Sequence, residues 1–198
     1  MEPNSDDRKP LVVVISGPSG VGKDAIISRM KKLAVPGEYI VTATTRPKRP
    51  GETNGRDYCF YAQAEFEAMI EAGQLLEHAC VYGNYYGVPL PPVEAAIEKS
   101  SDVFIKVDVQ GAETIRGKLP GSLLIFIEPP SYEELKRRLE KRLTESAEAL
   151  EHRLAAASRE MEKLPLFDFS VVNDSLDKAV AEIMNVVAKE KRRRSPSA

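Results

Sequence analysis

The sequence contains no tryptophan, only two cysteines and no long apolar run. Cys59 and Cys80 do not follow a metal-ligand spacing such as C-x-x-C, so we expect two reduced structural thiols. No apolar stretch approaches the roughly 18 residues that a membrane-spanning helix requires. The polar, acidic residues 1–10 resemble neither a signal peptide nor a transit peptide. We therefore expect a soluble cytoplasmic chain with no membrane partner.

An excess of charge is also absent, because 28 Lys and Arg residues stand against 30 Asp and Glu residues. A nucleic-acid-binding protein usually carries a basic field, so we expect no nucleic-acid partner. The run Lys191–Arg194 could bind RNA or mark nuclear import, but we interpret it as the solvated end of a helix. The composition leaves a monomer or a weak homodimer open.

Short β-branched runs alternate with helical stretches along the chain, which predicts an α/β fold with a mainly parallel central sheet flanked by helices. Leu11–Ser16 is typical of a strand that is buried on both faces. The other expected strands are Tyr39–Ala43, Val103–Val107, Leu123–Ile127 and Phe169–Val172. The expected helices are Ala25–Leu33, Pro91–Lys99, Gln110–Lys118, Tyr132–Arg142 and Leu176–Lys191.

Two regions interrupt this alternation. Arg46–Tyr61 is rich in Pro, Gly, Arg and Tyr, and together with Leu75–Val88 it predicts a small mixed lobe of short antiparallel strands at about residues 42–90. Residues 137–153 form a basic helical insertion with Leu143–Glu148 at its tip. We therefore expect one domain, with a core of residues 11–41, 91–136 and 154–191, the lobe, the insertion as a lid, and flexible ends at 1–10 and 192–198.

The segment Gly17-Pro18-Ser19-Gly20-Val21-Gly22-Lys23 matches the glycine, four residues, glycine, lysine pattern of phosphate-binding loops. Glycines allow successive backbone N–H groups to point at phosphate oxygens, and the following helix presents its positive end. Lys23 can then reach the β- and γ-phosphates. Because the segment follows a buried-type strand and opens a helix, it predicts a P-loop that binds ATP with Mg²⁺.

Asp24 departs from this pattern, which usually has Ser or Thr there as a Mg²⁺ ligand. An aspartate could bind Mg²⁺ directly or through water, or it could only favour the positive end of the helix. Asp24 is our candidate metal ligand.

Four further motifs give the chain a specific resemblance. They are Thr42–Gly51 (TATTRPKRPG), Gly55–Tyr58 (GRDY), Gly83–Gly87 (GNYYG) and Asp108–Gly111 (DVQG). In this order and spacing, and together with the P-loop, they resemble the guanylate kinase family from about residue 11 to residue 191. The resemblance implies a P-loop fold and the phosphorylation of GMP, and of dGMP, by ATP.

The lobe supplies residues suited to a monophosphate. The guanidinium groups of Arg46 and Arg49, with the phenol hydroxyls of Tyr58 and Tyr86, can surround a phosphate with charge-assisted bonds. A plain solvated charge cluster is the alternative, but the prolines and glycines of this stretch restrict its motion.

Glu77 lies between apolar residues, where an unpaired carboxylate is costly to bury. Guanine has two adjacent donors, N1–H and the N2 amino group, that one carboxylate can accept together, and adenine lacks them. The resemblance gives Glu77 this role and also places Thr42, Gly87 and Asp108 in the GMP site.

Two departures from the family concern base recognition. Val88 stands where many members have Ser or Thr, so a hydroxyl contact is missing. Lys106 stands at the first position of a common D-x-D pattern. The combination GVGKDAII, VTATTRP and IKVDVQG resembles plant plastid or mitochondrial members, so an organellar location stays open if a transit peptide was removed.

The reaction requires positive charge around the transferring group. We expect Lys23 and Arg46 to supply it, and the resemblance adds Arg142 and Arg153 from the lid as further catalytic residues. It also assigns Arg138 and Asn173 to the ATP site. For any one lid arginine, a solvated helix face remains the alternative.

Two other functions compete with this prediction. A guanylate-kinase-like interaction module keeps the fold but binds a phosphopeptide without catalysis. Such modules resemble the enzyme in the lobe but lose the glycine loop, its lysine or the lid arginines, all of which are present here. The second competitor is a kinase for a different small phosphorylated acceptor, and Glu77 argues against it.

Overall fold

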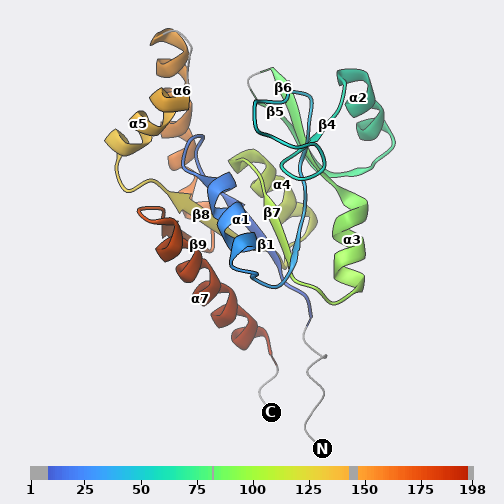
Figure 1. Ribbon diagram of the computed structural model, residues 1–198. Helices are drawn as coiled ribbons and strands as arrows, with labels where there is room; N and C mark the ends of the chain where they lie inside the picture. Colours follow the sequence, from blue (N-terminus) through green and yellow to red (C-terminus); the bar gives the residue numbers. More distant parts are fainter. Residues whose placement is uncertain (1–8, 82, 143–146, 196–198) are drawn as a thin grey trace, which may run out of the picture. The chain divides into compact units, whose positions relative to one another are not determined.

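The computed structural model describes residues 9–81, 83–142 and 147–195. The chain divides into two compact units. The first unit comprises Met1–Val14 and Pro36–Ser122, and the second comprises Ile15–Val35 and Leu123–Ala198. Most elements of both units are labelled in Figure 1.

The three inner strands of the central sheet are almost entirely buried, whereas its two edge strands are partly exposed. Its strand order is β2-β7-β1-β8-β9, in which β2 pairs with β7 and β8 pairs with β9 in parallel. The strands are β1 (Val12–Ser16), β2 (Glu38–Tyr39), β7 (Val103–Lys106), β8 (Leu123–Glu128) and β9 (Phe169–Val172). This mainly parallel sheet, with its helices, confirms the predicted α/β class.

The prediction of one strand over Tyr39–Ala43 is wrong, because this segment is divided between two sheets. Ile40 still donates its N–H to Phe104 at 3.0 Å beside β7, but the carbonyl of Thr42 accepts from Cys59 N–H at 2.9 Å. The chain thus changes hydrogen-bond partner within two residues. The second part is β3 (Ala43–Thr44), which belongs to the smaller sheet.

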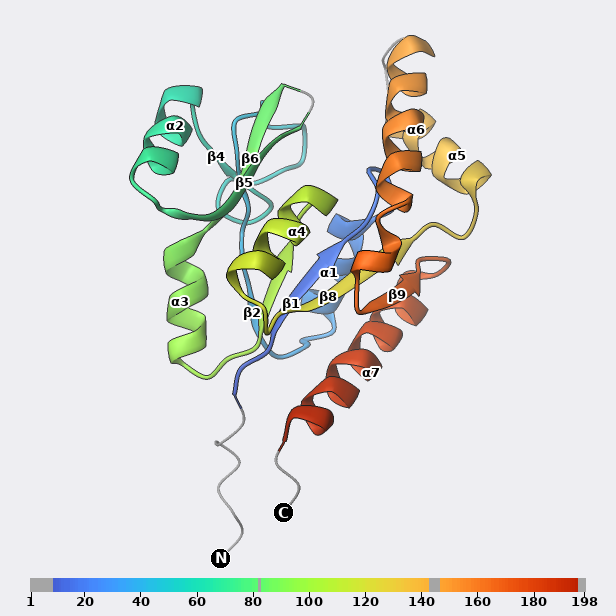
Figure 2. The same ribbon diagram turned by 180° about the vertical axis from the view of Figure 1, so that it is seen from behind.

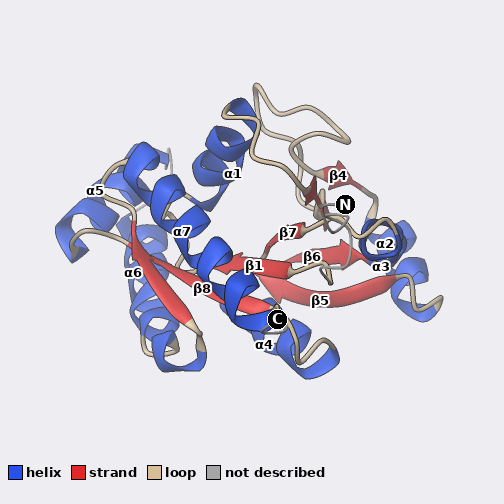
Figure 3. Cartoon of the chain, turned by 90° about the horizontal axis from the view of Figure 1, so that it is seen from below, coloured by secondary structure: helices blue, strands red, loops and turns tan. Residues whose placement is uncertain are grey.

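The smaller sheet has the order β4-β3-β6-β5, with β4 at Cys59–Phe60, β5 at Leu75–Val81 and β6 at Asn84–Pro89. Strands β5 and β6 form an antiparallel hairpin, visible in Figure 3, and β3 is antiparallel to β6. Strand β4 pairs with β3 in parallel, so the sheet is mixed rather than wholly antiparallel.

Helix α2 (Gln63–Glu71) was not expected in this lobe. The carboxylate of Glu65 accepts from the N–H of Ala62 at 2.7 Å, which satisfies a donor at the start of the helix. Phe66 is fully buried against Ala43 and Leu75. The helix therefore covers the small sheet with one apolar side.

The remaining helices of the first unit are α3 (Leu90–Glu98) and α4 (Val109–Lys118), close to the predicted bounds. Figure 2 shows both from behind. Asp108 precedes α4 and accepts from the N–H of Gly111 at 2.7 Å, a regular N-cap. Helix α4 packs against β5.

In the second unit, α1 (Lys23–Lys32) packs against α7 (Leu176–Arg194). An ion pair of 2.5 Å joins Arg29 to Asp177. Helix α7 continues beyond the predicted end at Lys191, and the buried carboxylate of Glu190 accepts from the side chains of both Arg193 and Arg194.

Helices α5 (Tyr132–Arg142) and α6 (Ala147–Met161) pack side by side through Leu135, Leu139, Leu154 and Ala157. The short 3₁₀ turn η1 (Leu164–Leu166) follows. Most of the expected lid tip, residues 143–146, lies outside the described residues.

Cys59 and Cys80 are free thiols, as expected. Over the described ranges, no helix is both long and apolar enough to cross a membrane.

Candidate functional site

The loop between β1 and α1 depends on glycine. Gly20 and Gly22 adopt φ of 84° and 105°, in the left-handed region that side chains disfavour. A Cβ on Gly20 would lie 2.7 Å from Leu139, and one on Gly22 would lie 2.5 Å from the amide of Asn173. Side chains from α5 and from the end of β9 thus lie directly against the loop.

The carbonyl of Val21 connects the loop to these elements. It accepts from the side-chain amide of Asn173 at 2.8 Å and from Nη1 of Arg138 at 3.1 Å. Nη2 of Arg138 donates to the carbonyl of Asn173 at 3.0 Å, and its Nε donates to Glu134 at 2.7 Å. Hydrogen bonds from Arg137 and Arg138 lower the pKa of Glu134 to about 2, so this carboxylate is ionised at neutral pH.

Two further polar side chains contact the backbone of the loop. Nζ of Lys23 donates to the carbonyls of Gly17 at 2.5 Å and Pro18 at 3.2 Å. The N–H of Ser19 donates to the carboxylate of Glu160 at 3.0 Å. A backbone donor of this loop therefore already holds an anionic group, which is the behaviour expected of a phosphate-binding loop.

The other predicted residues of the donor side have different surroundings. Asp24 is exposed in the first turn of α1, and Arg153 is half-buried in α6. Arg142 is the last residue of α5, and its side chain lies outside what the structure describes. Within the described residues, no group of three or more His, Cys, Asp or Glu side chains could hold a metal ion.

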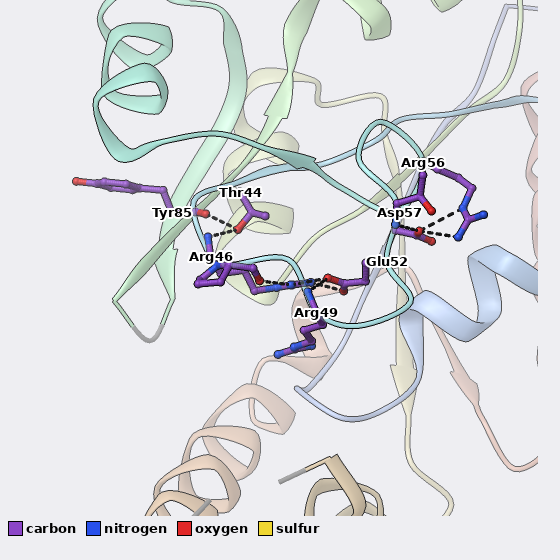
Figure 4. Close-up of polar contacts among 9 residues, drawn as sticks. Thr44, Arg46, Arg49, Glu52, Arg56, Asp57 and Tyr85 are labelled. Atoms are coloured by element: carbon purple, nitrogen blue, oxygen red, sulfur yellow. Dashed lines mark hydrogen bonds and ion pairs between the residues drawn. The ribbon is translucent and has the colours of Figure 1, made fainter. Parts of the chain in front are cut away.

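In the first unit, Arg46 is buried and paired with a carboxylate that the sequence analysis had not singled out. Its Nη1 and Nη2 donate to the two oxygens of Glu52 at 2.7 and 2.5 Å, and Nη1 also donates to the carbonyl of Pro47 at 3.0 Å. Figure 4 shows this end-on pair, with the guanidinium of Arg49 pointing away from it. Arg49 instead donates its backbone N–H to Glu52 at 2.8 Å.

Electrostatics keep both partners charged. Burial acts to lower the pKa of Arg46, but the hydrogen bonds and the charge of Glu52 outweigh it and raise that pKa above its ordinary value. The hydrogen bond from Arg46 lowers the pKa of Glu52. The guanidinium also lies over the rings of Tyr58 and Phe60, 4.7 and 5.5 Å from their centroids.

Tyr58 is the centre of a cationic and aromatic cluster. Its ring packs edge-on against Tyr86 with centroids 6.3 Å apart. Nζ of Lys106 lies over the same ring at 4.0 Å. The predicted phosphate-site residues Arg46, Tyr58 and Tyr86 therefore come together, and Lys106 adds a second cation beside them.

Glu77 is buried with 3% of its surface exposed, close to the start of α4. Burial first, and then the charge of Asp108, raise the pKa of Glu77 to about 8. A Cβ on Gly111 would lie 2.8 Å from Oε2 of Glu77, so only a glycine leaves this carboxyl room. Asp108 and Glu77, both predicted site residues, thus lie close enough for the charge of one to act on the other.

Thr42 and Gly87 are the remaining predicted residues of this part of the lobe. Thr42 is buried and donates its hydroxyl to the carbonyl of Lys106 at 3.2 Å. Gly87 faces His78 in the hairpin, and Val88, which is fully buried, faces Glu77.

Sequence reasoning missed Glu52, Phe60, Glu134 and Glu160. Glu52 ends the Pro- and Gly-rich stretch that begins at Arg46, so a carboxylate near two arginines was a usable signal. Glu160 contacts a residue 141 positions away, and no local pattern predicts such a contact.

Comparisons with known proteins agree with this geometry. The sequence profile named Guanylate kinase matches residues 8–190. The guanylate kinase of Enterococcus faecalis is 43% identical over 92% of this chain and 90% of its own length. That of Gloeobacter violaceus is 47% identical over 90% of this chain and 87% of its own length. The crystal structure of guanylate kinase from Anaplasma phagocytophilum superposes with a TM-score of 0.78 at 29% identity, covering 93% of this chain and 87% of the other.

Proposed function

Because the chain belongs to the guanylate kinase family, we propose that it transfers the γ-phosphoryl group of ATP to GMP, and to dGMP. The products are ADP and GDP or dGDP. The observation that carries the choice of acceptor is the buried carboxyl of Glu77 beside Asp108 and the first turn of α4.

Glu77 recognises the guanine base through hydrogen bonds. As a carboxylate it accepts from both N1–H and the N2 amino group of guanine, whereas adenine offers no matching pair of donors. A buried acceptor that stays unpaired costs free energy, which penalises the wrong base. Asp108, Thr42 and Gly87 complete this part of the GMP site.

The phosphate of GMP is held by Arg46, Arg49, Tyr58 and Tyr86. Arg46 is fixed before any substrate arrives, because it is buried and paired with Glu52. The attacking group is an oxygen of this phosphate, whose second pKa lies near 6, so it is ionised at neutral pH. No side chain is needed as a general base.

The ATP phosphates are held by the backbone of residues 17–24 and by Lys23, with Arg142 and Arg153 adding positive charge during transfer. The Nζ contacts of Lys23 with loop carbonyls are exchangeable for phosphate oxygens, because the lysine stem is flexible. Arg138 and Asn173 act through the carbonyl of Val21, which they hold from outside the loop.

Asp24 is the protein residue proposed to hold Mg²⁺. Mg²⁺ in phosphate sites keeps several waters and takes only one or two carboxylates, so a single exposed aspartate beside the loop fits its donor preferences. Bound there with the ATP phosphates, Mg²⁺ would supply further neutralisation of their charge. The alternative role of Asp24 is to favour the positive end of α1 without binding the metal.

The alternative is a non-catalytic guanylate-kinase-like module that binds a phosphopeptide. The loop, Lys23 and Arg153 favour the enzyme, since a peptide-binding module has no use for an ATP site.

The decisive experiment measures ADP release with ATP against GMP, dGMP, AMP, CMP and UMP, for the wild type and for Lys23→Ala. We expect turnover with GMP and dGMP only, and a loss of about a hundredfold or more in the variant. A wild type without GMP-dependent turnover would refute the proposal.

We place the reaction in the cytoplasm for the chain as given. The relatives named above are bacterial, and they do not test the resemblance to plant organellar members, which stays a prediction.

A further inference from the structure

We propose that Glu52 is a positioning residue for the acceptor phosphate, because it turns one particular edge of the Arg46 guanidinium toward the substrate. The inference rests on the proposed function, in which Arg46 binds the phosphate of GMP.

The hydrogen bonds of Arg46 show which edge of its guanidinium group Glu52 occupies and which edge is left for a substrate. Nη1 has two acceptors for its two hydrogens, an oxygen of Glu52 and the carbonyl of Pro47. Nη2 donates to the second oxygen of Glu52. The carboxylate therefore occupies the Nη1–Nη2 edge end-on.

The opposite edge consists of Nε–H and the second hydrogen of Nη2. Among the residues that the structure describes, no side chain or backbone acceptor is bonded to this edge. Two parallel N–H groups of this kind match two oxygens of one phosphate. Glu52 thus leaves the Nε–H and Nη2–H pair of Arg46 available to a phosphate and fixes the direction in which this pair, the donor fork, points.

The surroundings of Arg46 prevent it from turning the other edge outward. The side chain is 7% exposed, and its guanidinium lies over the rings of Tyr58 and Phe60. Glu52 in turn accepts the backbone N–H of Arg49, which fixes the carboxylate to the same loop. A rotation of the guanidinium would break two charge-assisted hydrogen bonds at once.

When Glu52 is neutralised, charge and geometry predict opposite changes in the affinity for GMP. This difference makes the inference testable. Glu52→Gln removes a negative charge from the neighbourhood of a bound phosphate, and by charge alone this should tighten GMP binding. If Glu52 instead positions the fork, the same change should weaken it, because Gln offers one oxygen and an NH₂ group that repels the guanidinium donors.

The experiment compares Glu52→Gln and Glu52→Asp with Arg56→Gln as the matched control. Arg56 belongs to the same loop, is exposed and pairs with Asp57 at 2.9 Å, away from Arg46 in Figure 4. Calorimetry gives the affinity for GMP, for guanosine, which lacks the phosphate, and for ATP. Steady-state turnover gives kcat and KM, and the thermal midpoint reports folding.

We expect Glu52→Gln to weaken GMP binding about ten- to a hundredfold and to lower kcat, while guanosine and ATP affinities stay within about twofold. Glu52→Asp keeps the charge at shorter reach and should lie between Glu52→Gln and the wild type. Arg56→Gln should match the wild type.

Three results overturn the inference. The first is unchanged or tighter GMP binding by Glu52→Gln, and the second is an equal loss of affinity for guanosine and ATP. If Glu52→Gln does not fold, the third is a Glu52→Asp variant whose GMP binding matches that of the wild type. In each of these cases wild-type GMP turnover persists, so the proposed function stands. A wild type that neither binds nor phosphorylates GMP refutes the proposed function itself.

Discussion

Raising the pH should tighten GMP binding and at the same time destabilise the ligand-free protein, since both properties depend on the proton of Glu77. In the proposed complex, the carboxyl must be ionised to accept from N1–H and N2–H of guanine. In the ligand-free fold, burial and the charge of Asp108 raise the pKa of Glu77 to about 8, so the neutral form dominates at neutral pH.

The size of the effect follows from that pKa. At pH 7 only about one tenth of the ligand-free protein carries ionised Glu77, so the apparent affinity for GMP is about tenfold below its limit. From pH 7 to well above 8 the affinity should rise by about this factor. Binding at pH 7 should release about 0.9 proton per GMP, because Glu77 changes from largely neutral to ionised.

The stability of the ligand-free protein changes in the opposite direction to GMP affinity, because it falls as the pH rises. The folded state holds a proton on Glu77 that the unfolded chain loses near its ordinary pKa of 4.5. This contribution is fully present below about pH 4.5 and is lost as the pH rises to about 8, with a slope of about 1.4 kcal/mol per pH unit. Glu77→Gln, which does not titrate, should lack this slope and lose most GMP activity.

Calorimetry between about pH 6.5 and 8.5, in buffers of different ionisation enthalpy, measures both affinity and released protons. The lower limit avoids the second ionisation of the GMP phosphate near pH 6. Urea titrations of the wild type and of Glu77→Gln at each pH give the difference in unfolding free energy. A flat GMP affinity without proton release, or an equal pH slope in both proteins, would refute the reasoning.

Three further predictions concern single sites. Asp24→Ser should shift the Mg²⁺ concentration for half-maximal rate by about threefold or more, and an unchanged Mg²⁺ titration and turnover would leave Asp24 with only its effect on helix α1. Gly111→Ala places a methyl group against Glu77 and should lower kcat/KM for GMP about tenfold or more at constant KM for ATP; equal GMP kinetics would contradict the crowding. Arg138→Met removes a donor to Val21 and should raise KM for ATP about tenfold without changing GMP affinity. An Arg138→Met enzyme with normal ATP kinetics would show that Asn173 alone holds the carbonyl.

The parts of the fold that depend on local pattern were predictable. A buried β-branched strand followed by Gly17–Lys23 predicts a phosphate-binding loop and little else. Gly20 and Gly22 have a positive φ and no room for a Cβ in the structure, so the pattern depends on glycine at these positions. The antiparallel pairing of β5 and β6 likewise agrees with the short antiparallel strands expected in the lobe. Helix α2 was missed although Phe66, Met69 and Ile70 recur at helical spacing, because the Pro- and Gly-rich composition around it favoured short strands.

Side-chain partners were harder to predict than backbone elements. Arg46 and Glu52 are six residues apart, and only the path of the chain between β3 and β4 makes them meet. Val21 and Asn173 are 152 positions apart, so their hydrogen bond exists only after the sheet has formed. The sequence indicated the residue types of the candidate site, whereas tertiary packing decides which hydrogen bond each one makes.

The double hydrogen bond on the Val21 carbonyl has a consequence for the entropy of nucleotide binding. In a trans peptide plane the carbonyl and the next N–H point in opposite directions, so holding Val21 O outward also sets the direction of the Gly22 N–H. A free glycine-rich loop would lose much backbone freedom on meeting a phosphate. Here that loss has already occurred during folding, and a phosphate would meet a donor whose direction is fixed in advance.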